Sequence, residues 1–184
     1  MIRKELAAIV GMKLPLLDAH RRNGDLPFDP SKAEAMDGAN RKWIRYSIHE
    51  AARLIAALDL AAAQGVTWSQ ACEILRSESI LCSGGGRPFE TPGIHVARAE
   101  FRNKFGEAPF HWSGPFRVYE GKIEAIGAAV AADVAGYNAR PNVEPIEAVS
   151  LVSVNLSRAY QIAIARAKAL GVEHGDDGQI EPDQ

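Results

Sequence analysis

Basic side chains near the start of the chain are the residues whose types and spacing best suit a chemical task. Arg21 and Arg22 are adjacent at the end of a short helical pattern, and the planar arginine fork binds phosphate or a guanine edge through paired hydrogen bonds. Other polar side chains close to them in the sequence could flank the same ligand: Arg3, Lys4, Lys13, His20, Arg41, Lys42, Arg45 and Tyr46. This pattern indicates an anion-binding surface.

The charge distribution favours the same interpretation. Residues 1–46 carry nine Lys and Arg against six Asp and Glu, whereas residues 81–184 carry ten against thirteen. A basic front with an acidic back suits a protein that contacts phosphates with one end. Structural alternatives stay open, because Arg21 and Arg22 could simply complement the negative end of a helix. Tyr46 could instead pack against the core.

Other reactive side chains do not form a recognisable site. The histidines show no i, i+4 pairing, and Cys72 and Cys82 lie ten positions apart without a partner pair. A metal held by His95, His111 and Cys82 would lack a fourth ligand. Gly84–Gly86 is not followed by the Lys-Ser/Thr of a phosphate loop, and no Ser or Cys occupies a nucleophile motif. We therefore expect no metal, no other cofactor and no enzymatic activity.

Two short helices are predicted at the start of the chain. The first covers Arg3–Val10, with its apolar residues on one side, and Gly11 ends it. The second begins at Pro15, whose missing N–H costs nothing in a first turn, and runs to Asn23 with Gly24 as a left-handed cap. A turn that begins with glycine joins them, as in a helix-turn-helix.

Capping boxes place the next two helices. Ser47–Glu50 and Thr67–Gln70 each combine a hydroxyl with a Glu or Gln three residues later, so that each side chain satisfies a free amide. The first of these helices is predicted to end at Gly65 and the second to continue through Leu75. Before them, Trp43–Tyr46 is typical of the returning strand of a hairpin.

Four segments occur in an order and spacing shared with known proteins. Glu5–Met12 matches the pattern e-L-A-x-x-x-G-v, and Gly11–Pro27 continues without a gap to x-G-L-L-P. Tyr46–Leu54 matches Y-S-x-x-D/E-x-x-R-L, and Gln64–Leu75 matches x-G-f-s-l-x-E-I-x-x-L-L. With these segments the first 75 residues resemble the MerR-like winged helix-turn-helix family, to which excisionase and small-terminase winged domains are related.

The resemblance implies that the second helix enters the major groove of DNA, with the basic residues named above on phosphates or base edges. The chain differs from the family in three places. Asp18-Ala19-His20 stands where the family usually carries Arg followed by Tyr, and Asp29–Trp43 lengthens the wing. Gly84–Gly86 lies where a long antiparallel dimer helix would follow Leu75.

The predicted organisation has four parts: residues 1–79 as the winged helix-turn-helix, 80–93 as a Gly/Pro-rich linker, 94–172 as a C-terminal α+β unit with a dimerisation or effector role, and 173–184 as a disordered acidic tail. The fold class expected is therefore mainly α, with a winged helix-turn-helix followed by an α+β unit.

Patterns in the second half leave alternatives open. A hairpin of Phe116–Tyr119 and Ile123–Ile126 competes with an Ala-rich helix around Ala125–Ala135. Val149–Leu156 alternates like a strand, although a buried helix also fits, and Ser157–Leu170 is helical.

The densest apolar segment after the linker, Val149–Leu170, is the expected dimer surface. Its helical part carries one apolar stripe, formed by Tyr160, Ala163, Ile164, Ala167 and Leu170. The alternative is that this stripe covers the chain's own core.

The composition and the absence of a membrane-spanning stretch limit the location and function that we expect. With 47% hydrophobic and 24% charged residues the chain is typical of globular proteins, and its longest apolar stretch, Ala125–Ala132, is too short to span a bilayer. No leader-like segment precedes the first helix, so a cytoplasmic location is expected. We expect a sequence-specific transcriptional regulator that binds double-stranded DNA as a homodimer. The alternatives are a phage or mobile-element DNA-architecture protein, and a protein-interaction module without DNA binding.

Overall fold

Helices and one small sheet form a mixed α+β fold in this computed structural model, which describes residues 1–29, 35–36, 43–63, 65–76, 89, 91–110, 112 and 114–172. The helices are α1 (Arg3–Val10), α2 (Leu14–Asn23), α3 (Ile48–Ala63), α4 (Trp68–Arg76), α6 (Ile123–Asn138) and α7 (Leu156–Ala169). The strands are β1 (Ala35–Met36), β2 (Trp43–Ile44), β3 (Ile94–Asn103), β4 (Phe116–Lys122) and β5 (Ile146–Asn155).

The ends of α1 and α2 are set by glycine. Gly11 follows α1 at φ 77° and Gly24 follows α2 at φ 71°, a left-handed conformation that a side chain disfavours. Both glycine amides donate back to carbonyls of the helix that they close. The sequence prediction of these stops is confirmed, except that α2 begins at Leu14, so that Pro15 is its second residue.

Both predicted capping boxes are present. The Ser47 amide donates to the Glu50 carboxylate at 2.7 Å, and the Glu50 amide donates to the Ser47 hydroxyl at 3.2 Å. Thr67 and Gln70 repeat the exchange at 3.0 and 3.3 Å. Each pair satisfies amides that the first helical turn leaves free, which fixes where α3 and α4 begin.

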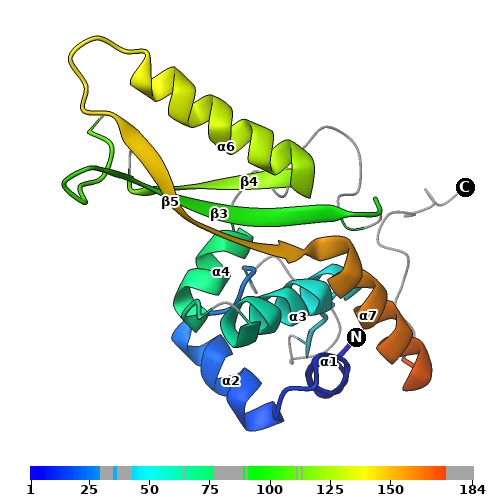
Figure 1. Ribbon diagram of the computed structural model, residues 1–184. Helices are drawn as coiled ribbons and strands as arrows, with labels where there is room; N and C mark the ends of the chain where they lie inside the picture. Colours follow the sequence, from blue (N-terminus) through cyan, green and yellow to red (C-terminus); the bar gives the residue numbers. More distant parts are fainter. Residues whose placement is uncertain are drawn as a thin grey trace, which may run out of the picture.

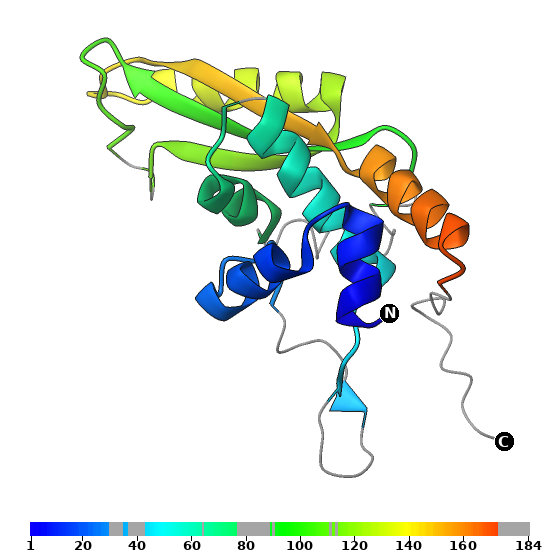
Figure 2. The ribbon, with the colours of Figure 1, turned by 90° about the horizontal axis from the view of Figure 1, so that it is seen from below.

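The larger hydrophobic core surrounds α3, which is buried on most of its circumference by α1, α4 and α7 (Figure 2). The fully buried side chains of this core include Leu6, Ile9, Leu54, Leu60, Ile74, Leu75 and Leu156. Burying such side chains contributes roughly 1.5–3 kcal/mol each. The last helix of the chain is thus part of the same core as the first.

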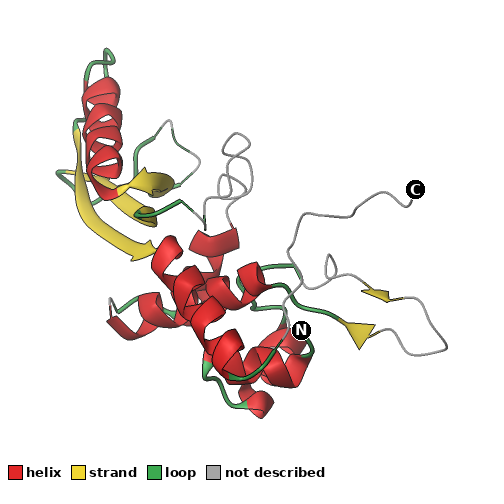
Figure 3. Ribbon diagram, turned by 90° about the vertical axis from the view of Figure 1, so that its right-hand side faces the viewer, coloured by secondary structure: helices red, strands yellow, loops and turns green. Residues whose placement is uncertain are grey.

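The three-stranded antiparallel sheet has the order β4-β3-β5, with β3 in the centre. Because side chains alternate along a strand, β3 serves two cores. Val96 joins the core around α3, whereas Ala97, Ala99 and Phe101 face α6 in a smaller core. In Figure 1 and Figure 3, α6 therefore lies on one side of the sheet and the remaining helices on the other.

The predicted hairpin of Phe116–Tyr119 with Ile123–Ile126, one of two alternatives for this region, is wrong. Phe116–Lys122 does form a strand, but it pairs with β3, from Glu100↔Phe116 to Ile94↔Lys122. Residues 123–126 are the first turn of α6 instead of a returning strand. For Val149–Leu156 the strand prediction is confirmed, since β5 covers Ile146–Asn155.

Most of the stripe expected to form a dimer surface on α7 is covered within the chain, although Leu170 at its end is 52% exposed. Ala163 and Ala167 are 0% exposed in the core around α3, and Tyr160 and Ile164 pack against it. The small side chains of Ala163 and Ala167 let α7 approach α3 and α1 closely. The buried part of this face is therefore not available to a second copy, and α7 is not separate from the N-terminal helices.

Of the predicted linker, residues 80–88 and 90 lie outside the described residues, as do residues 77–79 and the tail 173–184. Phe89 is described, and it is 5% exposed against the rings of His49 and Tyr160. None of the described helices is long and apolar enough to cross a bilayer.

Candidate nucleic-acid interface

The predicted basic residues gather on α1, α2 and the segment after β2. These elements lie away from the sheet, with α1 and α2 at the opposite end of the molecule and β1–β2 projecting beyond the helices (Figures 1 and 2). Five of the residues are exposed: Arg3, Lys4, Lys13, Arg22 and Arg45. Arg41 and Lys42 fall outside the described residues.

A surface hollow of about 440 Å³ joins the two helices. Its lining consists of Arg3 from α1 and five residues of α2, namely Leu14, Pro15, Asp18, Arg21 and Arg22. The α2 members occupy positions i, i+1, i+4, i+7 and i+8, which places them along one helix face. Three arginine side chains therefore line one concavity.

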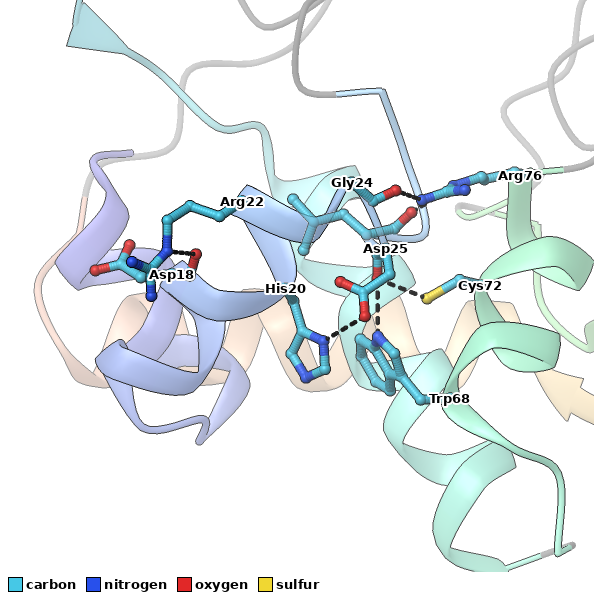
Figure 4. A network of polar contacts seen from close by, with 9 residues as sticks. Asp18, His20, Arg22, Gly24, Asp25, Trp68, Cys72 and Arg76 are labelled. Carbon is cyan, nitrogen blue, oxygen red and sulfur yellow. Dashed lines mark hydrogen bonds and ion pairs between the residues drawn. The ribbon is translucent and has the colours of Figure 1, made fainter.

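Asp18 is the acid within this basic hollow. Its Oδ1 lies 3.0 Å from Nη1 of Arg3, which ties α2 to α1. Arg22 folds along its own helix, and its Nε donates to the Asp18 carbonyl at 3.3 Å (Figure 4). The paired side chains of Arg3 and Asp18 remain partly open to solvent, since they are 44% and 29% exposed.

Tyr46 is not placed to contact a ligand directly. It is 3% exposed, and its ring lies 6.1 Å from that of Phe28 in an edge-on arrangement. Its hydroxyl hydrogen-bonds to Arg21, and burial raises its pKa more than Arg21 lowers it. The expected contact is corrected to a positioning role, in which Tyr46 holds Arg21 toward the hollow.

The His20 side chain packs against the protein instead of pointing into solvent. Its Nδ1 lies 3.0 Å from Oδ2 of Asp25, and its ring contacts that of Trp68 in a tilted arrangement at a centroid distance of 4.5 Å (Figure 4). With 17% of its side chain exposed, His20 belongs to the contact between α2 and α4. The structure thus separates it from the exposed cations.

One face of α4 fastens the end of α2. Trp68 donates from Nε1 to the Asp25 carbonyl at 2.8 Å, and the Cys72 thiol contacts the same oxygen at 3.2 Å. One turn further, Arg76 donates to the carbonyls of Gly24 and Leu26. Because these three residues are spaced four apart, they lie on one side of α4, and Figure 4 shows them reaching the same short segment.

The end of α1 is held from the other end of the chain. Nη1 of Arg166, on α7, donates to the carbonyls of Ile9 and Val10 at 3.0 and 3.1 Å. Sequence reasoning missed both arginine caps, Arg76 and Arg166, because no local signal connects residues so far apart. Contacts from α7 thus hold the end of α1, just before its turn to α2, and contacts from α4 hold the segment that follows α2.

The short hairpin beside these helices is formed by β1 and β2, with Ala35 opposite Ile44 and Met36 opposite Trp43. The backbone leaving β2 returns to the start of α1, where Met1 and Tyr46 exchange two backbone hydrogen bonds of 2.8 Å. The hairpin is therefore anchored next to Arg3 and Lys4.

No protein-family model matches the sequence, and no curated protein does. The candidate site is thus defined by its own geometry. Within the described part of the chain, no group of three or more His, Cys, Asp and Glu side chains is arranged to hold a metal ion. Cys82 and His111 are not among the described residues.

Proposed function

We propose that this protein is a sequence-specific DNA-binding transcriptional regulator and that α1, α2 and β1–β2 form a winged helix-turn-helix. The observation that carries the proposal is the convergence of Arg3, Arg21 and Arg22 on one hollow across two helices joined by a tight turn. A helix of this kind fits the major groove, where arginine pairs with guanine and with phosphates beside it.

Exposed cations around the hollow support the same function. Lys4, Lys13 and Arg45 are exposed on neighbouring elements, and cations spread in this way contact successive phosphates along a duplex. Such contacts set orientation and general affinity, whereas base contacts set the sequence. The proposal assigns the first role to these three residues and the second to the face of α2.

The fixed helix ends also support binding. Arg76 and Arg166 hold the ends of α2 and α1 through backbone carbonyls. A surface held in its binding geometry loses less conformational entropy on association. The helical unit is therefore a preorganised platform for Arg21 and Arg22.

Selection from random duplexes tests the proposal. The wild-type protein should enrich a defined motif, and its affinity should fall steeply with salt because phosphate contacts release counterions. Replacing Arg21 and Arg22 by Ala should weaken binding by about 1–3 kcal/mol. The matched control is Arg158→Ala, since Arg158 is an exposed arginine on α7, outside this surface.

An absence of any enriched motif would contradict the proposal. Genome-wide mapping then separates regulators from architectural proteins: a regulator occupies a few inverted repeats, whereas clustered sites with bent DNA would indicate an architectural role.

We also propose that two copies act together on DNA, because one winged unit covers only a few base pairs. The face of α7 first expected to join them is buried except at Leu170. The DNA complex should contain two chains per inverted repeat in sedimentation experiments. A complex with one chain per duplex would contradict this part of the proposal.

A further inference from the structure

The carboxylate of Asp18 poses a chemical problem for a surface that binds DNA. It lies in the same hollow as Arg3, Arg21 and Arg22, where a negative charge repels phosphate. An ion pair between partly exposed groups contributes little to stability, and both Arg3 and Asp18 are partly exposed. Stabilisation of the fold therefore gives a weak reason for an acid at this point.

The Arg3–Asp18 pair presents donors and acceptors side by side. Arg3 offers a fork of N–H donors, and a carboxylate with two oxygens has acceptor capacity beyond the single 3.0 Å contact to Arg3. Because one residue comes from α1 and the other from α2, the pair spans the surface between the helices.

The major-groove edge of a C·G base pair has the complementary arrangement. Guanine presents two acceptors, N7 and O6, and the neighbouring cytosine presents the N4 amino donor. An arginine fork suits the two guanine acceptors, and an aspartate suits the cytosine amino group. An A·T pair offers no pair of adjacent acceptors on one purine, so the arginine fork would be only half used.

We propose that Asp18 is a specificity-determining residue of this surface and that, together with Arg3, it recognises one C·G base pair in the major groove. This inference rests on the proposed DNA-binding function. Asp18 then has two roles, since it accepts from cytosine and holds the Arg3 guanidinium toward guanine. The acid lowers general affinity for phosphate and in exchange restricts the sequences that bind.

The test compares wild type, Asp18→Asn and Arg3→Lys in binding to random duplexes. Asparagine keeps the shape of Asp18 but removes its charge, and lysine keeps the charge of Arg3 but removes its fork. Wild type should prefer C·G at one position by roughly ten-fold. Both variants should lose that preference at that position alone, and Asp18→Asn should also bind unrelated duplexes more tightly than wild type does.

Lys4→Ala is the matched control, because Lys4 is exposed on α1 next to Arg3 but outside the hollow. It should weaken binding to all sequences equally. Thermal unfolding of each variant checks that the fold persists. If Asp18→Asn does not fold, Asp18→Glu is measured in its place and should keep part of the C·G preference.

The outcomes separate the two proposals. If the motif of Asp18→Asn is the same as that of wild type, the proposed role of Asp18 is wrong and DNA binding still stands. The same conclusion follows if Asp18→Asn changes the preference at an A·T base pair instead of a C·G base pair. Wild-type protein that enriches no motif overturns the proposed function, and the role of Asp18 with it.

Discussion

The guanidinium of Arg166 donates a hydrogen bond of 3.1 Å to the main-chain carbonyl of Val10, 156 positions earlier in the chain. Helix α1 thus ends on a side chain supplied by α7, immediately before the glycine that opens the turn to α2. Helix α7 therefore contributes to the geometry at the end of α1.

Arg166→Met should lower the free energy of unfolding by about 1–3 kcal/mol, because the carbonyls of Ile9 and Val10 lose a charged donor. Chemical denaturation measures the change. Arg158→Ala, on the exposed side of the same helix, is the control and should change stability by less than about 0.5 kcal/mol. Equal effects of the two variants would show that the cap contributes nothing specific.

Trp68→Phe should cost about 1 kcal/mol, since the phenyl ring still packs but the Nε1–H donor to the Asp25 carbonyl is lost. The tilted ring contact with His20 is weakened as well. Denaturant titration followed by circular dichroism measures the loss. Stability unchanged from wild type would mean that water replaces the indole donor without cost.

The thiol of Cys72 should make stability fall at alkaline pH. Burial raises its pKa to about 12 in the folded protein, with a smaller opposing effect of Arg76. An unfolded chain releases the thiol proton near its ordinary pKa of about 8.5, so stabilisation is complete below that pH and is lost as the pH rises toward 12.

The measurement compares unfolding between pH 8 and 11 in Cys82→Ser and in Cys72→Ala/Cys82→Ser. The double variant should show the shallower decline with pH. Tyr46 and Tyr119 also have raised pKa values, mainly through burial, so some decline should persist. Parallel curves would contradict the assignment to Cys72.

Deletion of the chain from Pro145 onward should abolish the folded state. It removes β5 and α7, and with them the buried side chains of Leu156, Ala159 and Ala163 that pack against α3. A soluble folded N-terminal fragment would contradict the shared core. A chain ending at Val172 keeps every described contact and should unfold like the full-length protein.

The elements that the sequence predicted correctly depend on local chemistry. Glycines at 11 and 24 and the capping pair Ser47–Glu50 act over three or four residues, so their signals are complete within a short window. Placing the exposed cations Arg3 and Arg22 needed only the two helices and their order. The positions of these two arginines in the candidate site could therefore be predicted from the sequence.

The parts that sequence reasoning missed depend on contacts between distant segments. Helix α6 lies over Ala97 and Ala99 of β3 and is itself rich in alanine. Its buried residues are Ile126, Val130 and Tyr137, and alanine and glycine fill most of the remaining positions. The pattern therefore has little periodicity, and helix and hairpin were both compatible with it. The positions of Arg76, Arg166 and Tyr46 likewise depend on tertiary packing.

The contact of Ser157 with both Thr91 and Ile94 has a consequence for the evolution and engineering of the protein. The Ser157 hydroxyl donates to the Thr91 carbonyl and accepts from the Ile94 amide at 3.0 Å. The chain thus leaves and re-enters the helical core at one point, which makes the sheet with α6 topologically an insertion. A short link from residue 92 to Leu156 would excise it and keep Leu156 in the helical core, although the core contacts of Val96 and Val154 would be lost. The same junction offers a place to graft a different domain.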